Sequence, residues 1–188
     1  MIRSFLAVEV SVPVLKRIER IQEEFKSSDP DVRWVNPAKI HLTLKFFGDI
    51  EESQIDSITS SIEIPVQSTQ PFQLKVYGTG AFPNPKNPRV VWVGFAEGKE
   101  ALSHLQKQLE SSLEKVGFPP EDRSFHPHLT LGRVKSSRGK GALAAKIEKY
   151  REEAYGEFQV ERVVLFKSDL KPSGPVYTLL REAKLGGI

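Results

Sequence analysis

Apolar residues recur along this chain with two alternating periods. A run rich in β-branched and aromatic side chains occupies residues 2–10, which favours a strand. After Pro13, apolar side chains recur every three or four residues as far as Phe25, as they do on one face of a helix. The same alternation continues through the chain. We expect strands at 2–10, 72–77, 89–95, 158–166 and 176–183, and two more in the segment that contains His41 and ends at Gly48 and in the segment that contains His128. We expect helices from Pro13 to Phe25 and at 49–63, 97–116 and 142–150.

A tetrapeptide, His-Leu-Thr-Leu, occurs twice, at 41–44 and at 128–131, which is an offset of 87 residues. A Phe-Gln pair before a predicted strand also recurs, at 72 and 158, with an offset of 86. Alternating strands and helices are common to many proteins, but that order alone does not explain identical tetrapeptides in register. We therefore predict an internal duplication within a single domain over 1–188, with approximate halves 1–80 and 88–188 joined by the Pro/Gly-rich segment 78–88.

The predicted fold class is α+β, with two pseudo-symmetric lobes that are each a small, mainly antiparallel sheet backed by helices. Successive side chains on a strand point to opposite faces. The leucines of each tetrapeptide are therefore expected in the core. His41 and Thr43 share the other face of their strand, as do His128 and Thr130. Two such strands brought together would form a central cleft with two imidazoles and two hydroxyls.

Composition narrows the class of protein. Hydrophobic residues make up 39% and charged residues 27% of the chain, as in ordinary soluble domains. No apolar run approaches the ~20 residues of a membrane helix, so we expect no membrane association and a cytoplasmic location. The absence of cysteine excludes disulfides, thiolate nucleophiles and cysteine-rich zinc sites. A net charge of +3 favours an anionic ligand, but weakly.

The tetrapeptides and their surroundings resemble the 2H phosphoesterase superfamily, and in extended form its RNA 2′,3′-cyclic phosphodiesterase branch, also called 2′-5′ RNA ligases. The matching segments are spread over nearly the whole chain in the expected order, at 3–7, 41–48, 80–83, 88–94 and 125–133. A lone His-x-Thr-x run is a weak signal, whereas two copies on predicted strands with these flanking runs are specific.

The resemblance implies hydrolysis of RNA 2′,3′-cyclic phosphate ends to 2′-phosphomonoesters without a metal ion or cofactor, together with a possible reverse joining of RNA ends through 2′-5′ linkages. It also implies that His41 is the proton donor to the 3′ oxygen and that His128 is the base that activates water. Histidine, with an ordinary pKa near ~6.5, suits either role near neutrality. Thr43 and Thr130 can donate hydrogen bonds to the phosphate without adding charge. The two motifs by themselves do not distinguish acid from base.

Four further residues are candidates for substrate binding. Arg133 lies at an odd spacing from the second motif histidine, which places it on the opposite strand face unless the strand ends or bulges near Gly132. A phosphate contact and an ordinary surface arginine are both open for it. Lys45 shares the face of the first motif histidine by parity. Trp34 and Phe125 precede the motif strands, where aromatic rings can stack on a base or pack in the core.

Two other function classes are open. An RNA- or nucleotide-binding protein without turnover would use the same basic cleft, but it has no need of a matched proton donor and acceptor. A zinc hydrolase usually needs three protein ligands, and the chain has no His-Glu-x-x-His run. There is also no glycine-rich Walker loop for ATP. We therefore expect an enzyme that acts as a monomer on RNA ends or nucleoside 2′,3′-cyclic phosphates, with no metal, cofactor or obligate protein partner.

Overall fold

The computed structural model describes residues 1–187 and contains two antiparallel sheets. The strands are β1 (Ile2–Glu9), β2 (Val32–Trp34), β3 (His41–Ile50), β4 (Phe72–Phe82), β5 (Val90–Phe95), β6 (Leu129–Val134), β7 (Ala154–Val160), β8 (Arg162–Lys171) and β9 (Gly174–Lys184). The helices are α1 (Val12–Lys26), α2 (Gln54–Gln67), α3 (Lys99–Glu114) and α4 (Lys140–Lys149), with a short 3₁₀ helix, η1 (Pro37–Lys39). One sheet has the order β3-β1-β8-β9 and the other β2-β6-β5-β4-β7.

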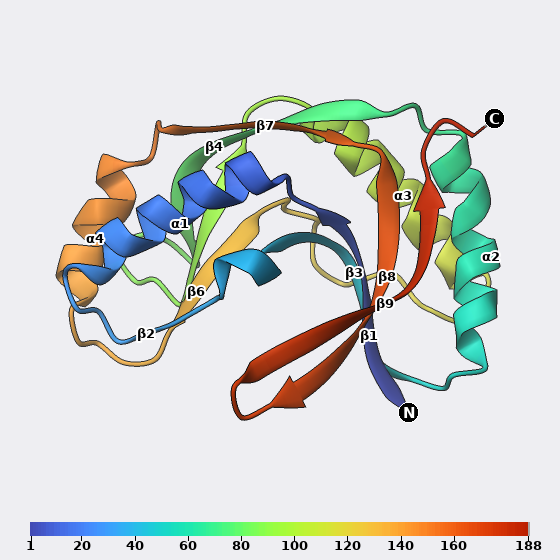
Figure 1. The fold of residues 1–188 in the computed structure, drawn as a ribbon, viewed down its shortest axis with the longest axis horizontal. Coiled ribbons are helices and arrows are strands. Elements are labelled where there is room, and N and C mark those ends of the chain that lie inside the picture. The colour runs from blue at the N-terminus through green and yellow to red at the C-terminus, as the bar shows by residue number, and fades with distance from the viewer. Residues whose placement is uncertain (188) are drawn as a thin grey trace.

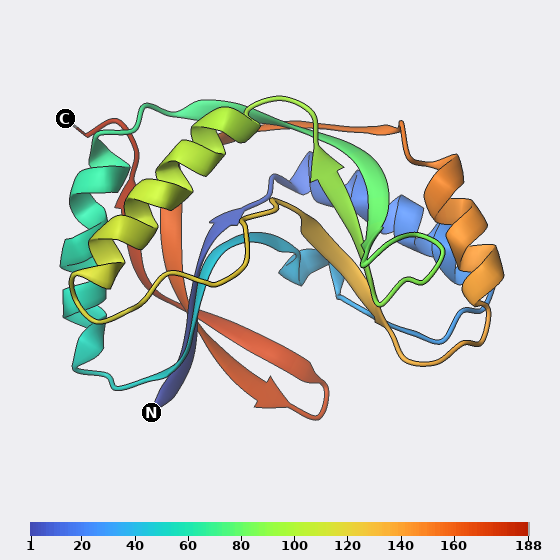
Figure 2. The ribbon, with the colours of Figure 1, turned by 180° about the vertical axis from the view of Figure 1, so that it is seen from behind.

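Each sheet is covered by two helices, as Figures 1 and 2 show from opposite sides. Helix α2 packs against β9 and α3 against β3, whereas α1 packs against β7 and α4 against β4. This arrangement confirms the predicted α+β fold with two antiparallel sheets backed by helices. None of the helices formed by residues 1–187 is both long and apolar enough to cross a membrane.

The two sheets exchange strands between the two halves of the chain. The first sheet joins β1 and β3 to β8 and β9, and the second joins β2 and β4 to β5, β6 and β7. The single strand predicted at 158–166 is wrong, because β7 ends at Val160 and β8 begins at Arg162 in the other sheet. Both segments favour extended backbone and a single residue separates them, so the local pattern carries no sign of the crossing. The internal duplication itself stays a prediction.

Two predicted boundaries are also wrong, and strand pairing explains both. The helix expected at 49–63 begins at Gln54, because Asp49 and Ile50 continue β3 by pairing with β1. The linker expected at 78–88 begins as strand, because β4 continues to Phe82 through a register shift at Gly78, which has a φ of +74°. Glycine adopts that backbone conformation without a steric penalty, so the strand passes the irregularity rather than ending there.

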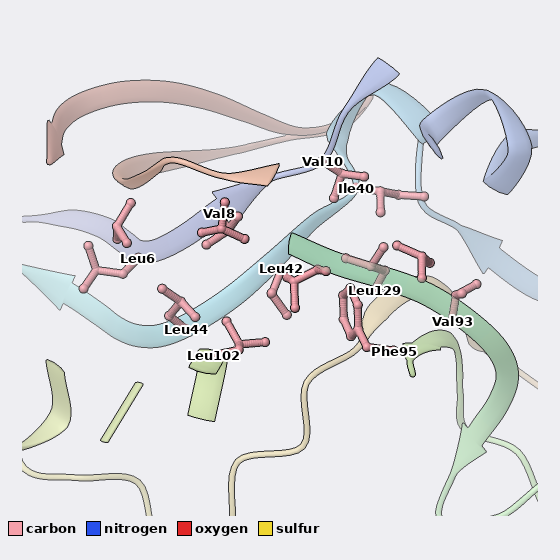
Figure 3. Packing of buried hydrophobic residues seen from close by; sticks show 14 of the residues in the cluster. Leu6, Val8, Val10, Ile40, Leu42, Leu44, Val93, Phe95, Leu102 and Leu129 are labelled. Carbon is pink, nitrogen blue, oxygen red and sulfur yellow. The ribbon is translucent and has the colours of Figure 1, made fainter. Parts of the chain in front are cut away.

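The leucines of both tetrapeptides lie in one hydrophobic core that contains residues from both sheets. Leu42 and Leu44 are 1% and 3% exposed, and Leu129 and Leu131 are both 0% exposed. Figure 3 shows Leu42 and Leu129 in the same part of this core, beside apolar residues of β1, β5 and α3. Because alternate side chains of each strand enter the core, the intervening histidines and threonines are directed to the opposite side.

Candidate active site

A cleft with a volume of about 550 Å³ is lined by residues of both sheets. His41 and Thr43 line it from β3. Thr130 lines it from β6, and His128 lines it from the position just before β6 begins. Phe5 of β1 and Tyr177 of β9 contribute to the wall nearest His41. The structure therefore brings the four motif side chains, which are far apart in the sequence, to a single site.

Each motif imidazole is held by the backbone carbonyl of the residue two positions before it. The Nδ1 atom of His41 lies 2.8 Å from the Lys39 carbonyl oxygen, and Nδ1 of His128 lies 2.6 Å from that of His126. A carbonyl oxygen can only accept a hydrogen bond, so Nδ1 carries the proton in both rings. Nε2 is then left to accept a proton when the ring is neutral and to donate one when it is charged. The two histidines are thus equally prepared for either role.

Aromatic rings surround both imidazoles. Phe5 stacks on His41 with ring centroids 4.6 Å apart, and Tyr177 meets His41 edge-on at 5.2 Å. Phe82 meets His128 edge-on at 4.9 Å. This packing fixes the ring planes and removes water from one side of each ring.

Burial among these rings lowers the pKa of both histidines from the ordinary value of 6.5. The hydrogen bonds to the Lys39 and His126 carbonyls oppose this effect in part. Electrostatic interactions with Arg133 and His126 lower the pKa of His128 further. In the free protein both rings therefore favour the neutral form at neutral pH.

The two motif strands share an irregularity that the alternation pattern does not reveal. In β3, Thr43 pairs with Ala7 and Lys45 with Leu6, so Leu44 is an extra residue. In β6, Thr130 pairs with Trp92 and Gly132 with Val91, so Leu131 is extra. An extra residue of this kind reverses the alternation of the side chains that follow it.

This bulge turns Lys45 away from the cleft, so the expectation that it shares a face with His41 is wrong. Lys45 is 4% exposed, and its Nζ atom donates hydrogen bonds of 2.8 Å to Oε2 of Glu110 on α3 and to the Pro119 carbonyl. It does not line the cleft, where Phe46 takes the position instead. Lys45 connects β3 to α3 and to the segment that follows it.

The equivalent bulge brings Arg133 into the cleft, which is the case the sequence left open. Arg133 is exposed and lines the cleft together with Thr130. Phe46 and Arg133 are themselves 87 positions apart, the offset of the two tetrapeptides. The guanidinium of Arg3 lies 4.6 Å from the centre of the Phe46 ring at the other side of the site.

The two aromatic candidates have different positions. Trp34 lines the cleft from β2 while also packing against Phe25 of the core, with ring centroids 6.3 Å apart. Phe125 does not line the cleft and packs against the core, which is one of the two environments that the sequence left open, so it is not a substrate-binding candidate. A local sequence signal cannot separate these cases, because an aromatic ring before a strand suits both environments.

The cleft is strongly basic. Its lining includes five cations and neither Asp nor Glu among the described residues. The five are Arg3, Arg33, Lys39, Arg133 and Lys135. Four of them, along with Phe46 and Tyr177, were not among the residues singled out from the sequence. The 87-residue offset from Arg133 could have identified Phe46. Arg3, Arg33 and Tyr177 come from the other strands β1, β2 and β9, whereas Lys39 and Lys135 lie just before β3 and just after β6. In residues 1–187, no group of three His, Asp or Glu side chains is arranged to hold a metal ion.

Comparisons with known proteins agree with this architecture. The model of the 2'-5' RNA ligase superfamily matches residues 10–172. The RNA 2',3'-cyclic phosphodiesterase of Methanothermobacter thermautotrophicus is 41% identical over 177 residues, which cover 94% of this chain and 95% of that protein. That of Aquifex aeolicus is 35% identical over 187 residues, covering 99% and 98%.

Solved structures show the same fold over nearly the whole chain. A Thermus thermophilus protein has a TM-score of 0.82 at 28% identity and covers 98% of both chains. E. coli LigT, solved with 3'-AMP, has a TM-score of 0.74 at 22% identity with the same coverage, which supports the fold. From the family match and the relatives together, this chain belongs to the 2'-5' RNA ligase superfamily.

Proposed function

We propose that this protein hydrolyses RNA 2′,3′-cyclic phosphate ends to 2′-phosphomonoesters by acid–base catalysis between His41 and His128. The observation that carries the proposal is the pair of imidazoles in one basic cleft, each with Nδ1 bound to a carbonyl and Nε2 left for chemistry. Relatives named RNA 2',3'-cyclic phosphodiesterase that match nearly the full chain support the substrate class.

The proposed reaction is an attack of water on the phosphorus atom. Nε2 of His128 takes a proton from water as the new P–O bond forms. The charged form of His41, which the bound phosphate anion favours, gives its Nε2 proton to the 3′ oxygen as the P–O3′ bond breaks. The product has a 2′-phosphate and a 3′-hydroxyl. The family resemblance assigns these roles, and the positive charge of Arg133 supports them, because it lowers the pKa of His128 and favours the neutral base.

Fixed donors are needed where charge builds on the non-bridging phosphate oxygens. Thr43 and Thr130 line the cleft beside the two imidazoles, and Arg133 adds a positive charge close to His128. A hydroxyl stabilises the developing charge without depressing the pKa of the neighbouring imidazoles, whereas an ammonium group in its place would depress it. The proposal requires no metal ion for this stabilisation.

The same groups can also serve 2′-5′ joining. Nε2 of His128 would take the proton of an RNA 5′-hydroxyl, in place of water, as that oxygen attacks phosphorus, and the charged form of His41 would protonate the 3′ oxygen as the P–O3′ bond breaks, which leaves a 2′-5′ phosphodiester and a 3′-hydroxyl. We include this joining as a second reaction of the proposed site. It is tested by incubating cyclic-phosphate and 5′-hydroxyl ends at high concentration and examining the linkage formed.

Turnover in the presence of a chelator tests the main proposal. Uridine 2′,3′-cyclic phosphate and a short RNA with a cyclic phosphate end are incubated with the protein in excess EDTA, and the products are identified by ³¹P NMR. We expect the 2′-phosphomonoester. Loss of activity on chelation, restored by a divalent metal, would contradict the mechanism, and tight binding without product would favour the binding protein considered above.

A further inference from the structure

Three basic side chains form a like-charge cluster that extends along the cleft from the neighbourhood of His128. Arg33 of β2 and Arg133 of β6 are direct partners in the antiparallel ladder. Lys135 lies two positions beyond Arg133, so it is on the same face of the sheet. All three are exposed and line the cleft. We refer to Arg33, Arg133 and Lys135 as the β2–β6 basic cluster.

Among residues 1–187, no carboxylate forms an ion pair within 4.0 Å with any of the three side chains. Asp31, two positions before Arg33, does not line the cleft, and Asp29 is paired with Arg138 instead. Like charges directly opposite on a sheet are destabilising. A bound anion would relieve this repulsion.

The cluster extends too far along the strand to serve one phosphate. Arg133 is close enough for its charge to act on His128, which places it at the catalytic end. Lys135 is seven positions beyond His128. Since an extended strand rises about 3.3 Å per residue, the Cα atoms of Lys135 and His128 are separated by on the order of 20 Å along the strand. A cyclic phosphate at the histidines and an anion at Lys135 must therefore be different groups.

We propose that Arg33 and Lys135 bind phosphodiesters upstream of the cyclic end, so that the protein selects RNA ends over mononucleotide 2′,3′-cyclic phosphates. This inference rests on the proposed function and adds to it where the rest of the RNA lies. The phosphate chain would run along β6 from the reacting group, past Arg133 and its cross-strand partner Arg33, to Lys135. Contacts of this kind are made to the backbone, so the preference is independent of base sequence.

The test compares two substrates that share the reacting nucleotide. Values of kcat/KM are measured for uridine 2′,3′-cyclic phosphate and for a tetrauridylate with the same cyclic end, using the wild-type protein and the double variant Arg33→Gln/Lys135→Gln. In the wild type we expect the longer substrate to be preferred at least tenfold. In the double variant this ratio should fall at least tenfold, mainly through KM. The slope of log kcat/KM against log salt should become less negative by about 0.7 for each lost phosphate contact.

Two controls separate a specific contact from a general loss of charge or fold. Arg20→Gln and Lys107→Gln remove the same charges from exposed positions of α1 and α3 that do not line the cleft, and they should keep the wild-type ratio. Far-UV circular dichroism and thermal unfolding check that each variant is folded. A tetrauridylate with one neutral methylphosphonate at successive upstream positions should lose its advantage in the wild type at the contacted position, with no further loss in the double variant.

The outcomes distinguish this inference from the proposed function. If the wild type hydrolyses the mononucleotide but the substrate ratio is the same in the double variant, the proposed function stands and the upstream site is wrong. Equal losses on both substrates would also overturn the inference, because Arg33 and Lys135 would then act at the reacting phosphate. If the wild type hydrolyses neither substrate, the upstream site is tested by the binding of labelled tetrauridylate to the wild type and the double variant, measured by fluorescence anisotropy. Equal affinity and salt slope in the two proteins would refute the upstream site, and weaker binding by the double variant would support it.

Discussion

Removing one partner of the Lys45–Glu110 ion pair should destabilise the protein far more than removing both. The pair lies between β3 and α3, and the side chains of Lys45 and Glu110 are 4% and 12% exposed. Nζ of Lys45 also donates to the Pro119 carbonyl, and Nε2 of Gln106 donates to the second oxygen of Glu110 at 3.2 Å. Each charge therefore has its hydrogen-bonding partners within the protein rather than in water.

The size of the effect follows from this burial. In Glu110→Ala the Lys45 ammonium keeps the Pro119 carbonyl but loses its counter-charge, and breaking a buried pair in this way costs about 3–5 kcal/mol. For a domain of this length, that loss corresponds to a fall in Tm of roughly 6–20 °C. Replacing both residues by apolar ones of similar volume, in Lys45→Met/Glu110→Leu, removes both charges. The free energy of unfolding of this double variant should lie within about 2 kcal/mol of the wild-type value. The remaining difference reflects the hydrogen bonds that Gln106 and the Pro119 carbonyl lose.

Urea unfolding of the wild type, Lys45→Met, Glu110→Leu and Lys45→Met/Glu110→Leu at pH 7 measures the coupling energy directly. Single variants that lose less than about 1 kcal/mol, or a coupling energy below about 0.5 kcal/mol, would refute the buried-pair argument. The same proteins test the position of Lys45. Because its side chain is outside the cleft, the double variant should keep kcat/KM within threefold of the wild type. A folded double variant with a hundredfold loss would show that Lys45 takes part in the reaction.

Three further predictions concern the histidines. Alanine at His41 or at His128 should lower the rate by roughly 10²–10⁴ in each case, and Thr43→Ala and Thr130→Ala should lower it less. The loss in the double histidine variant should be far smaller than the product of the two single losses. A single histidine variant with the wild-type rate would contradict the paired mechanism. A substrate whose leaving group needs no protonation should rescue His41→Ala but not His128→Ala, and rescue at His128 alone would reverse the assigned roles. Because burial lowers the pKa of both imidazoles below 6.5, the unfolded chain binds protons more readily and stability should fall as pH drops from 6.5 toward the lower folded pKa values. Urea unfolding from pH 7 to 5 should show a smaller fall in His41→Asn/His128→Asn, and an identical fall would argue against the lowered pKa values.

Local sequence patterns were sufficient for the elements whose signal lies within one segment. The stripe from Val14 to Phe25 is buried on α1, and the leucines of both tetrapeptides are in the core. These predictions succeed because the period of the apolar residues determines which face of a helix or strand can leave water. The family resemblance also depends on short runs of residues, so it could be recognised before any contact was known.

Tertiary structure alone decided where the alternation breaks and which strands meet. Lys45 turns inward and Arg133 turns into the cleft because the partner strands β1 and β5 each pair two residues against three. A bulge depends on the register with another strand, and the composition of the bulged strand does not specify it. The cleft cations Arg3 and Arg33 and the ring of Tyr177 come from β1, β2 and β9, which are distant in sequence. Their convergence is set by sheet order, and sheet order depends on the packing of the whole chain rather than on any one segment.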